Sequence, residues 1–220
     1  NIPAAVVPGF LDTNNNFRNT VSNEFDRLKI TIMGKFSGRE IPSVIIKALK
    51  ICKKNKLNFT VDIIGSGKGG WMETYWLWKL RSIFNNRDII NVRGYVPDIE
   101  KNNLLNKTDI FIMLRKPSME TEFLYPSRVT EFLFSGNPVI LTNTPSLNQF
   151  FLQGSGVYFI SDKNDSEELA KLLMNLANKP LERFKIGKKG HEYAVKNFSL
   201  EVMGEKLSNF IKHIHKFKKP

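Results

Sequence analysis

Cysteine is almost absent from this chain of 220 residues, in which Cys52 is the only one. A single cysteine excludes an internal disulfide, argues against a cysteine-based metal site and fits a reducing compartment. The three histidines, His191, His213 and His215, lie near the C-terminus. His213 and His215 do not share a helix face, which argues against a zinc site. We therefore expect no metal ion.

Long apolar runs are also absent. No stretch approaches the roughly 20 residues that cross a bilayer, and no signal peptide is visible at the start. The sequence begins with Asn1 rather than with an initiating methionine. We therefore expect a piece of a longer protein or a processed product.

Acidic residues are outnumbered, with 21 Asp and Glu against 33 Lys and Arg and a net charge of +12. This excess fits a solvated basic surface, an anionic ligand or an anionic membrane surface. Nucleic acid would require aromatic stacking platforms or a known recognition motif. The sequence shows neither, so we expect no nucleic-acid partner.

Beyond residue 27, apolar strand-like segments alternate with segments of helical periodicity. This pattern predicts an α/β fold, a Rossmann-like parallel sheet of about six strands with helices on both faces. In the second helix, Trp76 and Trp78 are expected to pack rather than to function. A short strand and turn is predicted at residues 6–12. The predicted strands are 28–33, 59–64, 89–92, 110–114, 138–141 and 157–160, and the predicted helices are 41–53, 71–84, 98–106, 129–135, 166–178, 181–197 and 200–217.

Ligands of such sheets bind beyond the carboxyl ends of the strands, where two glycine-rich loops are predicted. Gly34-Lys-Phe-Ser-Gly-Arg39 follows the first strand. Its glycines let the backbone approach a ligand, and Lys35 and Arg39 supply positive charge. The alternative is an ordinary turn with solvated bases.

The second loop, Gly65-Ser-Gly-Lys-Gly-Gly70, has the form G-x-G-x-x-G, which is typical of dinucleotide sites. Arg93 after the next strand would suit a 2′-phosphate, whereas no acid is present for the ribose of NAD. The loop is not a P-loop, because Gly-Lys-Ser/Thr is absent. An NADP-type oxidoreductase therefore remains an alternative.

The segment from Tyr125 to Leu141 is the most informative. The preceding strand delivers Arg115 to the ligand edge, and Ser127 suits an N-cap. Arg128 then lies in the first helical turn, where a cation is unfavourable unless an anion is bound there. Glu131, one turn further, suits the diol of a ribose. Together these residues predict a site for a nucleotide diphosphate.

These motifs resemble the C-terminal, nucleotide-sugar-binding domain of family-four retaining glycosyltransferases, which have the GT-B fold, almost from end to end. The match is most specific at Tyr125-Pro-Ser-Arg-Val-Thr-Glu131 followed by Gly136-Asn-Pro-Val139. The resemblance implies that Glu131 holds the ribose hydroxyls and that a backbone loop with Tyr95 and Val96 contacts the base. It implies that Arg39, Lys35 and Arg128 stabilise the departing diphosphate, and that Gly34, Gly65, Arg115 and Ser127 complete the donor site.

The resemblance also implies a UDP- or GDP-linked sugar donor, no metal and no separate cofactor. The acceptor would be a glycan or a lipid-linked molecule, in surface polysaccharide synthesis in the cytoplasm or at the inner face of the membrane. Residues 1–27 would be an interdomain linker, 28–198 the donor domain and 199–220 a helix that packs back on an N-terminal acceptor domain. That acceptor domain is missing here, so the fragment is expected to be inactive alone.

One departure from the family concerns the sugar. Many members place a second glutamate eight residues before the ribose-binding one, and Phe123 stands there. Glu120 and Glu122 are the nearest acids.

A third interpretation is a non-enzymatic membrane-surface domain, based on the net charge and on the basic tail Lys212–Lys219.

Overall fold

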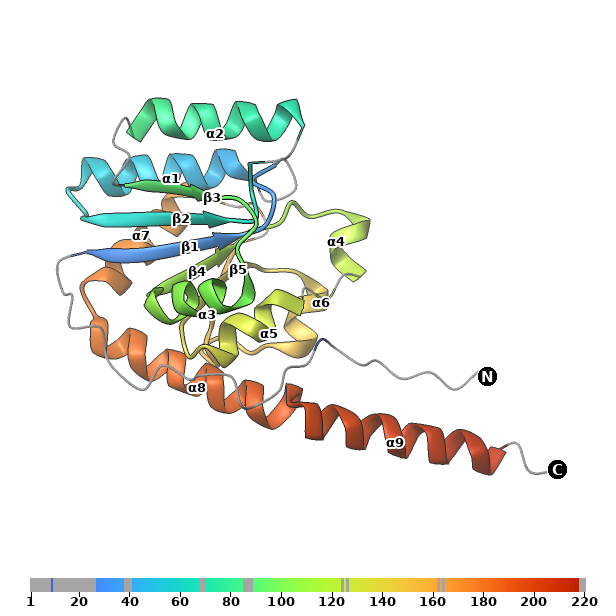
Figure 1. The fold of residues 1–220 in the computed structure, drawn as a ribbon. Helices are drawn as coiled ribbons and strands as arrows, with labels where there is room; N and C mark the ends of the chain where they lie inside the picture. The colour runs from blue at the N-terminus through green and yellow to red at the C-terminus, as the bar shows by residue number, and fades with distance from the viewer. Residues whose placement is uncertain are drawn as a thin grey trace.

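The structure, a computed structural model, describes residues 9, 27–37, 41–67, 70–84, 89–123, 125, 127–161, 163 and 165–217. Within these residues, six parallel strands form one sheet in the order β3-β2-β1-β4-β5-β6. This confirms the predicted Rossmann-like fold. Figure 1 shows the part of the sheet from β3 to β5. The strands are β1 (Leu28–Met33), β2 (Phe59–Ile64), β3 (Ile90–Arg93), β4 (Ile110–Met113), β5 (Val139–Thr142) and β6 (Val157–Ile160).

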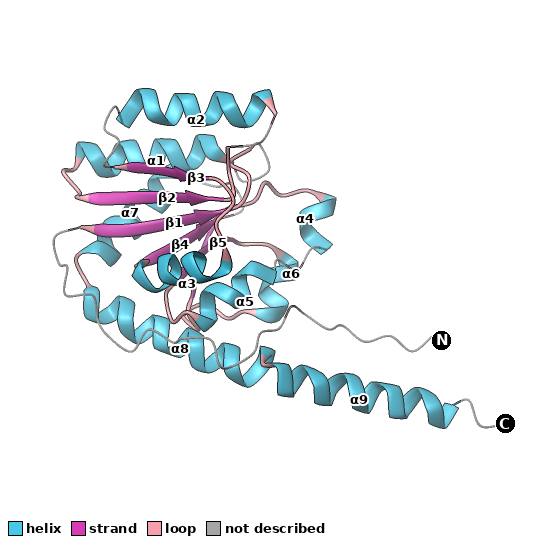
Figure 2. Ribbon diagram, in the orientation of Figure 1, coloured by secondary structure: helices cyan, strands magenta, loops and turns pink. Residues whose placement is uncertain are grey.

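Helices cover both faces of the sheet (Figure 2). On one face, α1, α2 and α7 bury their apolar sides in one core cluster. On the other, α5, α8 and residues of α3 and α9 build a second cluster. The bounds are α1 (Pro42–Lys54), α2 (Trp71–Phe84), α3 (Asp98–Lys107), α4 (Met119–Phe123), α5 (Ser127–Phe134), α6 (Pro145–Phe150), α7 (Ser166–Ala177), α8 (Pro180–Phe198) and α9 (Leu200–Phe217).

The strands form where the sequence is nearly continuously apolar, because both of their faces are covered. β4 and β5 are buried at every position. The ring of Phe111 in β4 stacks on that of Phe132 in α5, with centroids 4.2 Å apart. This contact fixes α5 against the sheet, so that the first turn of α5 lies at the carboxyl edge.

Helix α8 lies in close backbone contact with the turn between α5 and β5. A Cβ atom added to Gly187 would lie 1.9 Å from the backbone oxygen of Gly136, in the turn between α5 and β5. Only glycine allows two backbones to approach this closely. α8 therefore holds the C-terminal end of α5 in place. The next helix, α9, extends beyond the sheet (Figure 1).

Two short helices were not predicted, α4 and α6. Each is too short for apolar periodicity to reveal it. A local signal for α6 was present, however: Thr144 caps it by accepting from the N–H of Leu147 at 3.4 Å, and Pro145 occupies the first turn. α5 begins at Ser127, so Ser127 is its first residue rather than its cap. Of the strand predicted at 6–12, only Gly9 is among the described residues.

The prediction for the tryptophans of α2 is half wrong. Trp76 packs against the core, but Trp78 is 64% exposed. The inward positions of α2 are taken by Leu77, Leu80 and Phe84, and Trp78 follows Leu77 directly. One residue turns the helix by about 100°, so Trp78 points away from the sheet. None of the described helices is both long and apolar enough to span a membrane.

Candidate functional site

The loops after β1 and β2 are bound to each other at the carboxyl edge of the sheet. Gly34, with φ of 135°, donates its N–H to the carbonyl of Ile64 at 2.8 Å. Phe36 is fully buried and donates its N–H to the hydroxyl of Ser66 at 3.1 Å. Lys35 between them is exposed. The described part of the first loop, residues 34–37, is thus a fixed turn that leaves Lys35 exposed at the edge. Arg39, predicted to join Lys35, lies outside the described residues.

The glycine-rich second loop is occupied by a carboxylate of the protein itself. Glu73, in the first turn of α2, is only 3% exposed. Its Oε1 accepts from the hydroxyl of Ser66 and, at 3.2 Å, from the N–H of Gly67. In a dinucleotide site the pyrophosphate takes this place at the helix N-terminus. Glu73, which the sequence analysis missed, therefore argues against a dinucleotide in this loop.

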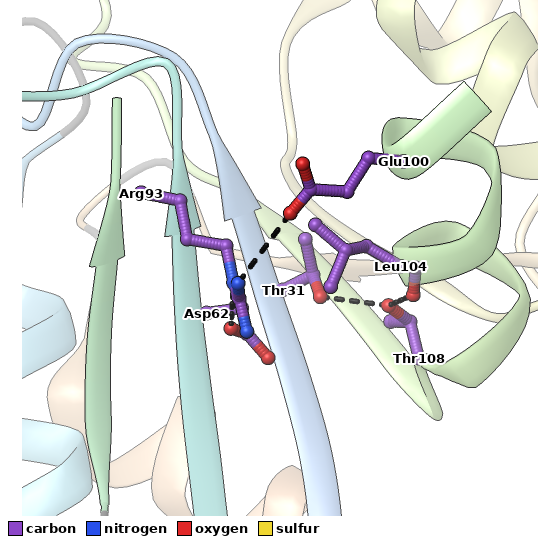
Figure 3. A network of polar contacts seen from close by, with 6 residues as sticks. All are labelled: Thr31, Asp62, Arg93, Glu100, Leu104 and Thr108. Atoms are coloured by element: carbon purple, nitrogen blue, oxygen red, sulfur yellow. Dashed lines mark hydrogen bonds and ion pairs between the residues drawn. The ribbon is translucent and has the colours of Figure 1, made fainter. Parts of the chain in front are cut away.

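Arg93, the residue considered for a 2′-phosphate, is engaged by two acids (Figure 3). Its Nε donates to Oδ1 of Asp62 at 2.8 Å, and its Nη1 lies 3.7 Å from Oε1 of Glu100. Asp62 is on the neighbouring strand and Glu100 is in α3. The guanidinium thus ties β3, β2 and α3 together, which is a structural role.

A second pair of contacts in Figure 3 fixes α3 to the sheet. The hydroxyls of Thr31 in β1 and Thr108 lie 2.7 Å apart, and Thr108 donates to the carbonyl of Leu104 at 2.9 Å. Thr31 and Thr108 are buried. Together with Arg93, these bonds hold α3 beside β1, where its first turn faces α5.

Arg128 in the first turn of α5 reaches across to β1. Its Nη1 donates to the carbonyl of Met33, the last residue of the strand, at 3.1 Å. The guanidinium has five N–H donors in a planar fork, and the side chain is exposed. The carbonyl bond orients the fork next to Gly34, and an anion bound at this edge would be within reach of its other donors.

Glu131, one turn further along α5, is held by a lysine that the sequence analysis missed. Nζ of Lys101 in α3 lies 2.7 Å from Oε1 of Glu131, and the two side chains are 25% and 20% exposed. Lys101 also lies 3.1 Å from Asp98. Burial acts to lower the pKa of the Lys101 ammonium, but hydrogen bonds and charge attraction from Glu131 and Asp98 outweigh it and raise that pKa. Lys101 is therefore charged at neutral pH and neutralises Glu131.

These contacts connect the predicted site residues in a ring. Arg128 binds the end of β1, and Gly34 binds the end of β2. The N–H of Gly65 donates to the carbonyl of Gly94 at 3.0 Å, in the loop that carries Tyr95 and Val96. That loop leads into α3, whose Lys101 returns to Glu131 in α5. The ring brings together Gly34, Lys35, Gly65, Tyr95, Val96, Arg128 and Glu131.

The loop after β4 carries Arg115 to the same edge. Its N–H donates to the hydroxyl of Thr142, at the end of β5, at 3.0 Å. Further along, the hydroxyl of Thr121 donates to the carbonyl of Lys116 at 2.8 Å. The side chains of Glu120 and Phe123 lie outside the described part of the chain, and Glu122 is exposed. The group that contacts the sugar thus stays an open prediction.

Ser127 lies beside Gly9. A Cβ atom added to Gly9 would come within 2.7 Å of the Cβ of Ser127. Residue 9 therefore lies next to the start of α5.

Among the described residues, no group of three or more acidic, histidine or cysteine side chains is arranged to hold a metal ion.

A cavity of about 280 Å³ opens elsewhere, at the amino ends of β1 and β2. Arg27, Asn58 and Arg183 are among the residues that line it. It contains none of the predicted site residues. The candidate site is therefore defined by the ring of contacts at the carboxyl edge and not by this cavity.

Comparison with known proteins supplies a family for this arrangement. The model of the family described as "Glycosyl transferases group 1" matches residues 13–193. A comparison with curated proteins finds no match.

Solved structures share the fold at low sequence identity. Anabaena Alr3699/HepE, in complex with UDP and glucose, is 14% identical with a TM-score of 0.74, over 94% of this chain and 56% of that one. Sucrose-phosphate synthase from Thermosynechococcus elongatus is 13% identical with a TM-score of 0.75, over 96% and 53%. The C-terminal domain of the group 1 glycosyl transferase LpcC from Francisella tularensis is 16% identical with a TM-score of 0.67, over 86% and 99%. The chain thus spans little more than half of the first two proteins.

Proposed function

The chain belongs to the group 1 glycosyl transferase family, and from this premise we propose that it binds the nucleotide-sugar donor of a retaining glycosyltransferase. The donor would be a UDP- or GDP-linked sugar. UDP is the first candidate, because the similar Anabaena structure contains UDP and glucose. The observation that carries the proposal is the pair Arg128 and Glu131, one turn apart in α5 and each anchored to a different neighbouring element.

The proposed chemistry is electrostatic. As the bond between the sugar and the diphosphate breaks, negative charge develops on the leaving diphosphate, and cations fixed beside it lower the barrier. Arg128 is fixed by its bond to Met33, and Lys35 is exposed on the adjoining loop. Arg39 is proposed to join them. No metal ion is needed for this role, and none is proposed.

Glu131 is proposed to bind the ribose. A carboxylate offers about four lone-pair positions over two oxygens, and Lys101 engages Oε1. Oε2 can then accept from the ribose hydroxyls. Lys101 acts as a positioning residue, because it holds the carboxylate at the edge before the nucleotide arrives. The backbone at Tyr95 and Val96 is proposed to contact the base, and Gly34, Gly65, Arg115 and Ser127 to complete the site.

The acceptor is proposed to be a glycan or a lipid-linked molecule in polysaccharide synthesis, at the cytoplasmic face of a membrane. An N-terminal domain would supply the acceptor side, and residues 199–220 would pack on it. Exposed Leu207 and Ile211 in α9 support such a contact. By itself the present chain is expected to bind nucleotide without significant turnover.

The oxidoreductase alternative is less well supported. Glu73 occupies the loop that would hold a pyrophosphate, and Arg93 is bound by Asp62 and Glu100. A membrane-surface role does not compete with sugar transfer, because both can belong to one protein.

Isothermal titration calorimetry with UDP, GDP and NADP⁺ tests the proposal. We expect one of the two nucleoside diphosphates to bind and Glu131→Ala to weaken it about tenfold or more, since a hydrogen bond to a charged group contributes about 1.5–3 kcal/mol. Glu192→Ala on α8 is the matched control and should leave the affinity unchanged, because its side chain is 63% exposed and pairs with Lys188 of the same helix. Absence of binding by UDP and GDP at millimolar concentration would contradict the proposal. Binding of NADP⁺ alone would favour the oxidoreductase.

A further inference from the structure

Helix α2 carries a row of exposed aromatic side chains. Trp71, Tyr75 and Trp78 are 78%, 44% and 64% exposed, and Met72 beside them is 42% exposed. The spacing i, i+4 and i+7 places the three rings on one side of the helix, opposite the buried Leu77 and Leu80. A group of exposed aromatic side chains on one side of a helix is typical of an interaction surface.

Neighbouring rings of α2 are in contact, and we call Trp71, Tyr75, Trp76 and Trp78 together the aromatic ridge. The centroid of Tyr75 lies 5.1 Å from that of Trp76, edge to face, and 6.4 Å from that of Trp78. Nζ of Lys79 lies 5.2 Å from the centroid of Trp76 and 5.6 Å from that of Tyr75. A cation therefore lies directly at the aromatic ridge.

Helix α1 lies alongside α2 and adds further cations. Nζ of Lys53 donates to the carbonyl of Ile83 in α2 at 3.5 Å and lies 5.3 Å from the ring centroid of Phe84. The exposed lysines of α1 are Lys47, Lys50, Lys53 and Lys54.

No acidic side chain is exposed on either helix. α1 contains no acid, and Glu73, the only acid of α2, is buried. Arg81 of α2 is exposed as well. We call the surface of these two helices the α1–α2 face, defined by the exposed aromatic row Trp71, Tyr75 and Trp78 and by the cations Lys47, Lys50, Lys53, Lys54, Lys79 and Arg81.

We propose that the α1–α2 face docks on an anionic lipid bilayer. Trp and Tyr prefer the headgroup region of a membrane, where the ring is in an apolar environment and the N–H or O–H reaches water. Lysines beside them attract acidic headgroups. The face combines both features and lacks exposed acids that would repel the surface.

Two other occupants fit less well. A second copy of the chain would bring two rows of lysines together, and like charges opposed across an interface are unfavourable. Single-stranded nucleic acid would need separate flat rings on which successive bases stack. Here Tyr75 packs edge-on against Trp76 and is tilted by 33° to Trp78. The rings therefore offer a ridge that can enter a headgroup layer.

The orientation of α2 links this face to the candidate site. α2 begins directly after the loop of Gly65 and Gly67, at the carboxyl edge of the sheet (Figure 1). Docking through Trp71 would hold that edge near the membrane. The benefit for a lipid-linked acceptor rests on the proposed function, whereas membrane binding itself does not. The surface also differs from the basic tail, whose described residues belong to α9, beyond the other face of the sheet (Figure 1).

Vesicle co-sedimentation tests the inference, with phosphatidylcholine vesicles and with vesicles that also contain phosphatidylglycerol. The protein should bind the anionic vesicles and be released by salt. Replacement of Lys47, Lys50 and Lys54 by glutamine should weaken binding on the order of a hundredfold, because each lysine near an anionic surface contributes about fivefold. The control with the same change of net charge replaces Lys185, Lys188 and Lys189 of α8, which are also exposed, and should lower binding much less.

The aromatic ridge is tested by Trp71→Ser with Trp78→Ser, which should reduce binding roughly tenfold or more through lost apolar contact. Both side chains are exposed, so the fold should persist, and unchanged UDP affinity of the variant checks this. Three results would each overturn the inference. The α8 control could lose as much vesicle binding as the lysine variant of α1, the tryptophan variant could bind as well as the unchanged protein, or the protein could bind neutral and anionic vesicles equally. A dimer that the tryptophan variant dissociates, or RNA binding in place of vesicle binding, would overturn it as well. Vesicle binding without nucleotide binding would contradict the proposed function alone.

Discussion

The ion pair between Lys101 and Glu131 permits a quantitative test of the candidate site. Its N–O distance of 2.7 Å corresponds to a Coulomb attraction on the order of 6 kcal/mol at an effective dielectric constant of about 20. The free-energy cost of removing both groups from water offsets most of that attraction. Exposed pairs contribute about 0.2–1 kcal/mol, and breaking a fully buried pair costs about 3–5 kcal/mol. With side chains 25% and 20% exposed, this pair falls between the two, at about 1–2 kcal/mol.

A double-mutant cycle measures that value. Lys101→Met and Glu131→Gln should each lower the free energy of unfolding in urea, and together they should lower it by about 1–2 kcal/mol less than the sum of the two single effects. Lys101 also contacts Asp98 at 3.1 Å, but the side chain of Asp98 is 87% exposed. The cycle of Lys101→Met with Asp98→Asn is therefore the internal control, with a coupling of a few tenths of a kcal/mol.

The pH dependence of this pair follows from the raised pKa of Lys101. A base whose pKa is raised by folding stabilises the protein fully below its unfolded pKa of about 10.4, and loses that contribution as the pH rises through the folded pKa. The coupling should thus be constant from pH 7 to 9. Additivity of the two substitutions within about 0.3 kcal/mol at pH 7.5 would refute the reasoning, because independent sites behave in that way.

Three further predictions concern the packing, the core thiol and the site. Gly187→Ala should lower the free energy of unfolding in urea by about 1–3 kcal/mol, because its Cβ would lie 1.9 Å from a backbone oxygen. Gly204→Ala is the control and should be neutral or stabilising, because no atom lies within 4 Å of its added Cβ. Equal effects of the two substitutions would contradict the close approach of α8. Burial raises the pKa of Cys52 to about 11, so the thiol should stay unreactive to Ellman's reagent at pH 8 until urea unfolds the chain. The contribution of the protonated thiol to stability should be complete below pH 9 and be lost as the pH rises through 11. Rapid labelling of the native protein would show this prediction to be wrong. Arg128→Lys should weaken binding of UDP roughly tenfold but not that of uridine, because lysine lacks the planar fork, and an equal loss for both ligands in calorimetry would remove Arg128 from the diphosphate.

Much of the fold followed from the sequence, because its signals are local. Strands covered on both faces must be apolar throughout, and helices repeat their apolar residues every three or four positions. These patterns located every strand within one residue. Short α4 and α6 escaped, since a helix of one or two turns has no period to detect.

The sequence by itself also indicated the family, through the resemblance of its motifs, and it supplied the chemical types at the carboxyl edge, a cation and a carboxylate one turn apart after Tyr125. Only the tertiary structure decided which groups meet. α3 crosses back from the edge strand β3 to the central strand β4, and this brings Lys101 to Glu131. Lys101 and Glu131 lie 30 positions apart on two different helices, so their pairing depends on how α3 and α5 pack, and no local pattern could reveal it.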